Sequence, residues 1–578
     1  MNALPPDDHE RDGIEEGKRL VRVGGDKGLS LAERFSERLQ RLAWRSPIHR
    51  FRLRGRHPLK LIAVAEDPFF GDVERGQALL DGMLRYRGET RNLSGLDLDK
   101  PTYSAAFAEY LHSFAWLRDL SSVATRATAA PIAEAIMRQW VAAHGDQVAD
   151  PAWRPDLAGW RILYWVAHAP LILSSADLVY RSNVLHALAR GARHLDRTAD
   201  KVPAGVPRLA AWCGVVASGL MIPGGDPRRA FGEAGLERAL SVSISEDGGT
   251  LGRSPERQRD AVVLLTMLCQ TYGARRLDPP AVVEDALKRA VAALLGVCHG
   301  DGGTSSWQGS GPIPAEVIAQ TVEATGVRTR PLKQARDWGY QRLSAGSSVL
   351  ILDAAPPPVA RVVEGGCAST LAFEMSDGDR RLIVNCGGAR AVHSSVPRKL
   401  AEGLRTTAAH STLVLDDSNS TAIHDDGTLG RGVGEIELSR SEDGGVARIE
   451  ASHDGYVRRY GFIHRRHMAL AADGRDLRGE DSLVPAGKRR RKTDSPFAIR
   501  FHLGPSVEVS PTADGLAAFL RLPGGAVWQF RAKGAALDID DSLWIDGSGR
   551  PRLTKQLVLT GETPAGGASV TWLFRRAR

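Results

Sequence analysis

A tyrosine and a histidine four residues apart form one pair in the sequence that could perform acid–base chemistry. Tyr164 and His168 fall in a run of helical periodicity over residues 161–173, so their side chains are expected on one face of a helix. Such a pair could give a substrate a base and a neutraliser of charge. The same spacing also fits a packed tyrosine beside a hydrogen-bonded core histidine, and both interpretations stay open.

Arginines near this pair and further along the chain are candidates for binding an anionic substrate. Arg161 could pair with a carboxylate through two parallel hydrogen bonds, or it could form an internal salt bridge. Arg253, followed by Arg257 and Arg259, comes directly after the Asp-Gly-Gly turn at 247–249. These three could line an anionic cleft or extend into solvent.

Tryptophans are candidates for sugar binding, because the C–H faces of sugar rings pack on aromatic faces. The five candidate tryptophans are Trp153, Trp160, Trp165, Trp307 and Trp338. At helical spacing a tryptophan more often belongs to the core. Trp307 differs because it stands in the Gly-rich loop 301–309, and such loops often carry function. Asp301 begins that loop with an Asp-Gly-Gly turn of the kind that needs a positive φ.

The elements that must position these residues change character near residue 339. Helical spacing dominates from residue 31 to residue 298, and Gly, Pro and Asp turns separate the runs. Short apolar strands bounded by Gly and Asp turns dominate afterwards. The runs expected as helices are 131–144, 161–173, 209–221, 260–272 and 282–298, and those expected as strands include 348–352, 371–376, 381–385, 411–415, 448–452 and 497–502. We expect a loose arm over 1–30, paired antiparallel helices over 31–335 and an antiparallel β-sandwich over 336–578.

Composition excludes several classes of protein. Charged residues make up 25% of the 578 and hydrophobic residues 43%, which is typical of globular chains. Five cysteines without a CxxC pair argue against a disulfide framework or a zinc–thiolate site. Residues 1–10 carry acidic side chains and have no apolar signal region, and the chain has no apolar run of membrane length. We therefore expect a cytoplasmic protein with no membrane span.

The net charge of +8 permits binding to a polyanion without requiring it. The strongest basic run is Lys488-Arg489-Arg490-Arg491-Lys492, which fits either a heparin-binding or nuclear-localisation pattern or a solvated hairpin tip. A nucleic-acid partner is the weakest of the alternatives, because no nucleic-acid-binding motif accompanies the basic run.

Several strings of residues resemble the heparinase II/III family of polysaccharide lyases. They are 382–388 (LIVNCGG), 409–416 (AHSTLVLD), 451–456 (ASHDGY), 464–467 and 474–481 in the second half, with 159–165 and 300–303 in the first. The resemblance implies an incomplete (α/α) toroid followed by an antiparallel β-sandwich. It also implies β-elimination of a uronate-containing acidic polysaccharide that lies between the two domains.

The resemblance implies catalysis by an Asn or His on a toroid helix, a Tyr, and a His, often with another His from the sandwich. The helix at 211–219 contains neither Asn nor His, and Gln258 stands where the catalytic Tyr is expected. Tyr164, His168 and His410 are the catalytic candidates that remain. The expected substrate-binding residues are Trp160, Arg161, Arg253, Asp301 and Trp307. The alternative is a non-catalytic protein that binds acidic glycans, having kept the fold and lost the Asn/Tyr pair.

The resemblance further implies one zinc ion in the sandwich, held by two His and one Asp. His410 and His453 are the candidate imidazole ligands, and Asp426 is the candidate carboxylate, with Asp425 and Asp416 as rivals. Alternatively, the two histidines are hydrogen-bonded residues that hold a strand and a loop. No organic cofactor is expected. The family's usual place in the cell envelope is the alternative to the cytoplasm.

Overall fold

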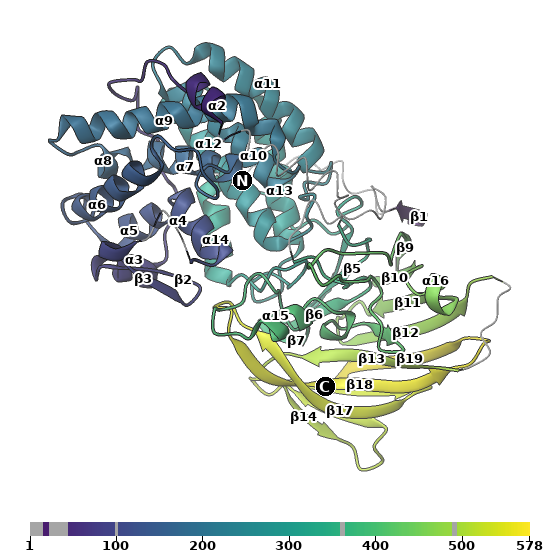
Figure 1. The fold of residues 1–578 in the computed structure, drawn as a ribbon. Coiled ribbons are helices and arrows are strands. Elements are labelled where there is room, and N and C mark those ends of the chain that lie inside the picture. The colour runs from purple at the N-terminus through teal and green to yellow at the C-terminus, as the bar shows by residue number, and fades with distance from the viewer. Residues whose placement is uncertain are drawn as a thin grey trace, which may run out of the picture.

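The computed structural model describes residues 15–21, 44, 46–96, 98, 102–358, 365–487 and 494–577. It has a helical lobe and a β lobe that lie against each other (Figure 1). The helical lobe contains α2 (Pro47–Arg52), α3 (Val73–Leu80), α4 (Ala105–Ser113), α5 (Trp116–Val123), α6 (Arg126–His144), α7 (Pro155–Ala167), α8 (Ala169–Ile172), α9 (Leu178–Thr198), α10 (Val206–Met221), α11 (Asp226–Ser243), α12 (Pro255–Ala274), α13 (Ala281–Gly296) and α14 (Ala315–Thr325), with a small hairpin of β2 (Met83–Tyr86) and β3 (Glu89–Asn92). In the described part of the chain, no helix combines the length and apolarity needed to cross a membrane.

Helix α10 is the centre of the helical lobe. Nearly all of its residues are buried, and it packs against α7, α11 and α12. Its contact with α7 is possible only because both helices carry glycine at the crossing. A Cβ on Gly159 would lie 1.9 Å from the carbonyl oxygen of Ala210, and a Cβ on Gly214 would lie 2.6 Å from the Cα of Gly159. Substituting either glycine would therefore force the two helix backbones apart.

The β lobe is a sandwich of two mostly antiparallel sheets, as the strand pattern predicts. The first has nine strands in the order β1-β9-β10-β11-β12-β19-β16-β15-β14, and the second has eight, in the order β17-β18-β13-β7-β6-β5-β4 with β8 paired to β13. Their bounds are β1 (Glu15–Val21), β4 (Tyr340–Ala345), β5 (Ser348–Asp353), β6 (Phe373–Asp377), β7 (Arg380–Val384), β8 (Leu413–Leu415), β9 (Glu435–Asp443), β10 (Val446–His453), β11 (Phe462–Leu470), β12 (Asp476–Pro485), β13 (Ser495–Leu503), β14 (Glu508–Pro511), β15 (Ala517–Arg521), β16 (Val527–Lys533), β17 (Ala536–Ile545), β18 (Pro551–Thr563) and β19 (Ala568–Arg576). Two short helices, α15 (Arg398–Gly403) and α16 (Val457–Tyr460), lie in this half.

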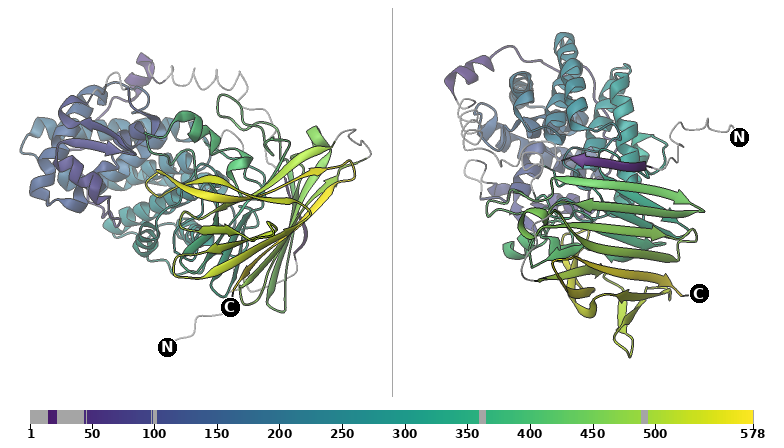
Figure 2. Two further views of the ribbon diagram at one scale, coloured as in Figure 1. Left: turned by 90° about the horizontal axis from the view of Figure 1, so that it is seen from below. Right: turned by 90° about the vertical axis from the view of Figure 1, so that its right-hand side faces the viewer.

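The period-two pattern places apolar side chains between the sheets. Strand β11 alternates buried and partly exposed residues along its whole length, and β12 does the same. The inner faces meet in one apolar core, in which Phe373 stacks on Trp572 with ring centres 5.7 Å apart. Figure 2 shows the two sheets layered beneath the helical lobe.

The N-terminal segment departs from the expected loose arm. Residues Glu15–Val21 form β1, which pairs antiparallel with β9 and places Leu20 opposite Ile436. Figure 2 shows this strand at the edge of the sandwich sheet. The other residues of the predicted arm lie outside the described part of the chain, as does the basic run 488–492.

Candidate functional site

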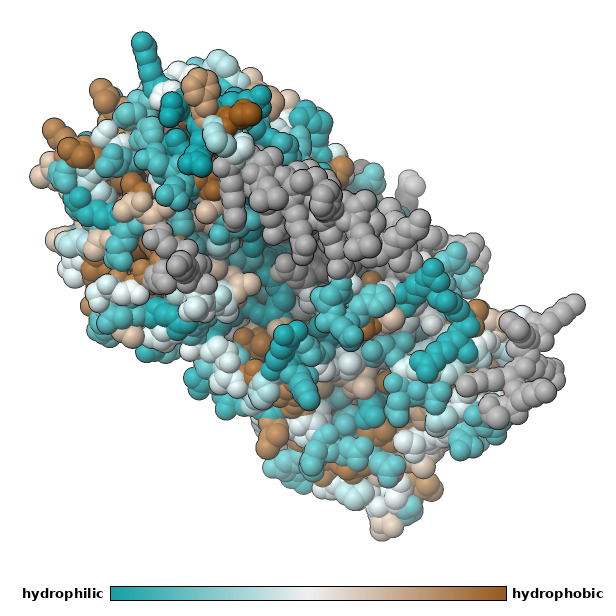
Figure 3. All heavy atoms as spheres, in the orientation of Figure 1, coloured by the Kyte–Doolittle hydropathy of each residue, from teal (hydrophilic) through white to brown (hydrophobic). Residues whose placement is uncertain are grey.

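A hollow lined by hydrophilic residues separates the two lobes (Figure 3). At this seam one carboxylate contacts three arginines from different parts of the chain. Glu109 of α4 lies 3.2 Å from Arg154, 3.7 Å from Arg257 of α12 and 3.5 Å from Arg390, which follows β7. Each of the four side chains keeps between 22% and 33% of its surface exposed. The contact between the helical and β halves is therefore charged and partly open to solvent.

A second carboxylate at the seam is neutralised in the same way. Glu256, at the start of α12, is paired with Arg87 of the β2–β3 turn. Burial alone would raise the pKa of Glu256, but the charges of Arg87, Arg257 and Arg390 lower it to about 2. Arg87 also donates to the carbonyl of Arg390. Glu256 is thus ionised at neutral pH and already engaged by cations of its own chain.

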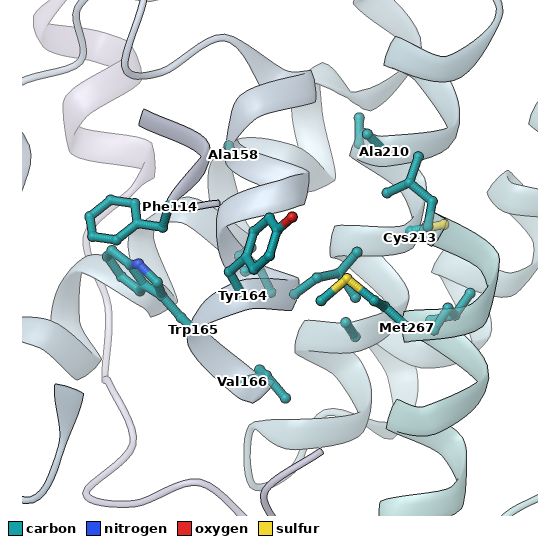
Figure 4. Close-up of a cluster of buried hydrophobic side chains, with 14 of the residues drawn as sticks. Phe114, Ala158, Tyr164, Trp165, Val166, Ala210, Cys213 and Met267 are labelled. Carbon is teal, nitrogen blue, oxygen red and sulfur yellow. The ribbon is translucent and has the colours of Figure 1, made fainter. Parts of the chain in front are cut away.

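Tyr164 lies in the last turn of α7 and His168 directly follows that helix, and the two rings form a ladder with Trp160. The ring centres of Trp160 and Tyr164 are 5.9 Å apart, and those of Tyr164 and His168 are 6.3 Å apart. Tyr164 is only 5% exposed, and burial raises its pKa to about 12. Figure 4 shows its ring among buried side chains that include Trp165, Val166 and Met267. A phenol with this pKa stays protonated at neutral pH.

His168 contacts a buried carboxylate. Its Nε2 lies 3.0 Å from Oδ2 of Asp67, whose carboxylate also accepts two hydrogen bonds from Arg118, at 2.8 and 2.9 Å. The Arg118 guanidinium lies 5.0 Å from the centre of the Tyr164 ring. The pair Tyr164 and His168 thus belongs to a packed, hydrogen-bonded cluster that joins α5 and α7 to the segment before α3.

Arg161 points into the helical core. It is 3% exposed, donates to the carbonyls of His112 and Ala152 at 3.0 and 2.7 Å, and lies 4.5 Å from the centre of the Trp140 ring. Among the described residues it forms no ion pair, and burial lowers its pKa to about 9. It is therefore remote from any substrate carboxylate. Trp160, by contrast, is partly exposed.

Arg253 joins the two lobes instead of lining a cleft. Its guanidinium pairs with Asp353 at the end of β5, and the two side chains are 7% and 0% exposed. It also donates to the carbonyls of Trp338 and Pro356, at 2.7 and 3.1 Å, and its own carbonyl accepts a hydrogen bond from Tyr340. All of these partners belong to the β half or its approach. The prediction that Arg253 binds substrate is wrong, because its guanidinium is buried and bonded to residues of the same chain.

The loop 301–309 is likewise an interlobe contact. Asp301 accepts two hydrogen bonds from Arg381 of β7, at 2.7 and 3.1 Å. Burial raises the pKa of Asp301, but the pairing with Arg381 outweighs burial, so the pKa is lowered overall. Trp307 is 1% exposed and donates to Ser305 at 2.6 Å. It packs in a small core with Trp338 and Tyr340. The expectation of a cleft tryptophan is therefore wrong at position 307, where the ring fills the junction between lobes.

Comparison with known proteins identifies the β half. Residues 327–573 match the model of the heparinase II/III-like C-terminal domain. A solved heparinase III has a TM-score of 0.69 to this chain at 14% identity, covering 96% of this chain and 93% of its own. Residues 327–573 therefore form a heparinase II/III-like C-terminal domain.

Two further relatives are similar over most of the chain. Heparan sulfate lyase HepC from Pedobacter heparinus has a TM-score of 0.56 at 15% identity, covering 87% of this chain and 82% of its own. FtsZ-localized protein C from Caulobacter vibrioides is 28% identical over 553 residues, which is 92% of each chain. The heparinase II/III-like fold, with its helical lobe and β-sandwich, is thereby confirmed.

In the helical lobe, Gln258 is a structural residue. It is fully buried, and its Oε1 accepts from the amide of Thr250 at 2.7 Å. Its Nε2 donates to the carbonyls of Gly248 and Ala290, at 2.8 and 2.9 Å. The side chain at the position expected for a catalytic tyrosine is therefore saturated by backbone groups and closed to a substrate. The segment 211–219 of α10 is buried throughout.

The predicted zinc ligands in the heparinase II/III-like domain are not brought together. His410 is buried with its Nδ1 2.7 Å from the carbonyl of Thr406, while Asp426 lies on an exposed turn and accepts from Thr428. His453 receives a hydrogen bond from the amide of Gly455 and contacts His464 at 3.2 Å. Among the described residues, no group of three or more His, Cys, Asp or Glu could hold a metal ion. The residues present do not fit the zinc site.

Asp481 of β12, which no sequence motif singled out, organises this part of the sandwich. Asp481 is fully buried. Its Oδ1 lies 2.8 Å from both His464 Nε2 and Arg466 Nε, and its Oδ2 accepts a hydrogen bond from Trp572 Nε1 at 2.8 Å. The pKa of Asp481 is strongly lowered: burial opposes ionisation, and Arg466 and His464 more than offset it. The period-two placement of His464 and Arg466 on one strand was the available signal.

Removing metal is expected to leave the stability of the chain unchanged. The imidazoles of His453 and His464 are committed to neighbouring groups, so chelation has no ligand set to release. Thermal unfolding of protein purified without chelator should give the same midpoint before and after dialysis against EDTA. Elemental analysis that finds about one zinc per chain, together with a lower midpoint after chelation, would contradict this expectation.

Proposed function

We propose that this heparinase II/III-like chain does not cleave polysaccharides and instead works with the FtsZ-based division apparatus. Support for the partner comes from the relative that matches over 92% of each chain and is named for its localisation with FtsZ. The polysaccharide lyases match at 14% and 15% identity, which supports a common fold alone. Under this proposal the chain acts in the cytoplasm as a binding protein.

The observation that carries the loss of catalysis is the state of Gln258. A β-elimination needs a base that reaches the substrate, and this amide is buried and saturated by three backbone groups. Tyr164 offers no replacement, because its pKa of about 12 leaves it protonated at neutral pH. The carboxylates of Glu109 and Glu256 are paired with arginines of the same chain. The charges at the seam are thus neutralised by partners within the chain, which supports a site without a free catalytic base.

One residue favours a second candidate, the binding of an acidic glycan without cleavage. Arg259 of α12 donates through Nε to Thr321 at 3.0 Å and, within the described ranges, forms no ion pair. Burial lowers its pKa, which is the direction expected for a cation that lacks a full counter-charge. A carboxylate or sulfate of a glycan would supply that counter-charge. Arg259→Ala should then abolish retention on a heparin column, while the catalytic assay stays negative.

The test of the proposed function combines an activity assay with a localisation assay. Purified chain is incubated with heparan sulfate, chondroitin sulfate and polygalacturonate, and the ultraviolet absorbance of the unsaturated product is followed, with heparinase III as the positive control. We expect no absorbance change. A fluorescent fusion should gather at the division site of a bacterium that depends on FtsZ, and the purified chain should sediment with FtsZ polymers. Product formation, or a diffuse fusion that does not sediment, contradicts the proposal.

A further inference from the structure

A groove crosses the end of the helical lobe that lies farthest from the sandwich, where Figure 1 shows α6, α8 and α9. It consists of two adjoining depressions of about 350 Å³ and about 800 Å³, which share Arg126 and Ser174. The smaller depression lies between the segment 59–64, the start of α6, α8 and the first turns of α9. The groove is separate from the seam and uses none of its residues.

The floor and one wall of the groove are apolar. Leu59, Ile62 and Val64 are 85%, 44% and 49% exposed, so three large aliphatic side chains within six residues face solvent. Pro170 and Leu173 also line this depression. Covering exposed aliphatic surface contributes roughly 25 cal/mol per Å², so this wall favours a partner with apolar side chains.

Three cations stand around this apolar surface without an internal counter-charge. Lys60, Arg126 and Arg181 line the smaller depression, and none forms an ion pair with another described residue. Arg138 of the larger depression differs, because it is paired with Glu134 and Asp177. The unpaired charge is thus concentrated at the apolar end of the groove, where it complements carboxylates.

The backbone of the segment 61–64 adds directional hydrogen-bond donors. Only the amide of Ile62 is engaged, by the carbonyl of Met221 at 3.0 Å. The amides of Leu61, Ala63 and Val64 donate no hydrogen bond to the rest of the described chain. Backbone donors beside apolar side chains are the features that an extended peptide pairs with, while lipid acyl chains have no acceptor to offer them.

We propose that this groove binds an extended peptide segment of a protein partner, in which apolar side chains alternate with or adjoin carboxylates. The apolar side chains of the peptide lie on Ile62 and Val64, and its carboxylates meet Lys60, Arg126 and Arg181. Its backbone carbonyls accept hydrogen bonds from the amides of Leu61, Ala63 and Val64. The proposal is independent of the division role proposed above, because it concerns a surface that neither the seam nor the sandwich contributes to.

The test selects peptides from a displayed library of random twelve-residue sequences on the immobilised full-length chain. Counter-selection uses the variant Lys60→Glu/Arg126→Glu/Arg181→Glu, whose exposed or half-exposed substitutions leave the core intact. The matched control reverses three exposed cations elsewhere, Lys288→Glu/Arg289→Glu/Arg478→Glu. Thermal unfolding checks that both variants fold. The selected peptides are then synthesised with a fluorophore and their affinities measured by anisotropy.

We expect the enriched peptides to combine apolar and acidic residues. Their affinity should fall at least ten-fold for the groove variant and for Ile62→Asp, and should change less than two-fold for the control variant. Three results would overturn the proposal: no enrichment over counter-selection, enrichment of basic or purely apolar peptides, or equal binding to the groove and control variants. Sedimentation with vesicles of anionic phospholipid that depends on the groove cations would also overturn it, since that result assigns the surface to a membrane.

Discussion

Lowering the pH from about 7 to about 5 should reduce the free energy of unfolding by about 4 kcal/mol or more. Burial lowers the pKa values of His194 and His502 to about 3, and it lowers those of several other core histidines. Unfolded histidine titrates near pH 6.5, so below that pH the unfolded chain takes up protons that the fold excludes. The stabilising effect of keeping each such histidine neutral is fully present above pH 6.5. Below pH 6.5, each of them lowers the free energy of unfolding by about 1.4 kcal/mol per pH unit.

The measurement is a series of urea unfolding curves between these two pH values. His502→Gln should lower the stability near pH 7, because it disturbs the contacts with Ser542 and the carbonyl of Ala408. The same substitution should flatten the pH dependence by about 1.4 kcal/mol per unit. The exposed His424 provides the control, and His424→Gln should leave the slope unchanged. A wild-type stability that does not fall below pH 6.5 would contradict the prediction.

Breaking the interlobe ion pair of Arg253 and Asp353 should strongly destabilise the fold. Asp353→Ala leaves the Arg253 guanidinium buried without its counter-charge, and it also removes the acceptor of a hydrogen bond from Ser369. Loss of one partner of a buried pair typically costs about 3–5 kcal/mol. We therefore expect a lower urea midpoint, and because Arg253 contacts both lobes, the two lobes should lose structure at lower urea together.

The matched control is a pair of the same types at the surface. Arg552 and Asp546 lie 2.8 Å apart, but the arginine side chain is 62% exposed. Arg552→Ala should change the stability by less than about 1 kcal/mol. If Asp353→Ala lowers the stability no more than Arg552→Ala does, the buried pair does not stabilise the contact between the lobes, and the prediction is wrong.

Most of the architecture could be predicted from periodicity, because each lobe buries one face of regular elements. The expected helix 209–221 is α10, which begins at Val206, and the expected strand 348–352 lies within β5. The change of character near residue 339 coincides with the start of β4 at Tyr340. Strand β1 could not be predicted, since its partner β9 is more than 400 residues away and a charged heptad carries little strand signal.

The candidate site was harder to predict, for a physical reason. An arginine or tryptophan between elements has the same local sequence whether it faces a cleft or another domain. Arg253 and Trp307 both proved to serve the contact between lobes, where burial is provided by residues distant in sequence. Tyr164 and His168 were correctly placed on one face, but the ion pair of Asp67 and Arg118 that holds His168 comes from other segments. The absence of the family's catalytic residues at Gln258 and in 211–219 could be recognised from the sequence, because the residue types there cannot act as a base.

Strand β1 precedes the helices in the sequence and pairs with β9 of the sandwich. The chain leaves the nine-stranded sheet after Val21 and returns to the β half only at Tyr340, so the helices form an insertion bracketed by strands. The anchoring strand lies at a sheet border, and its detachment would bare the hydrogen-bonding rim of β9 to strands of other molecules.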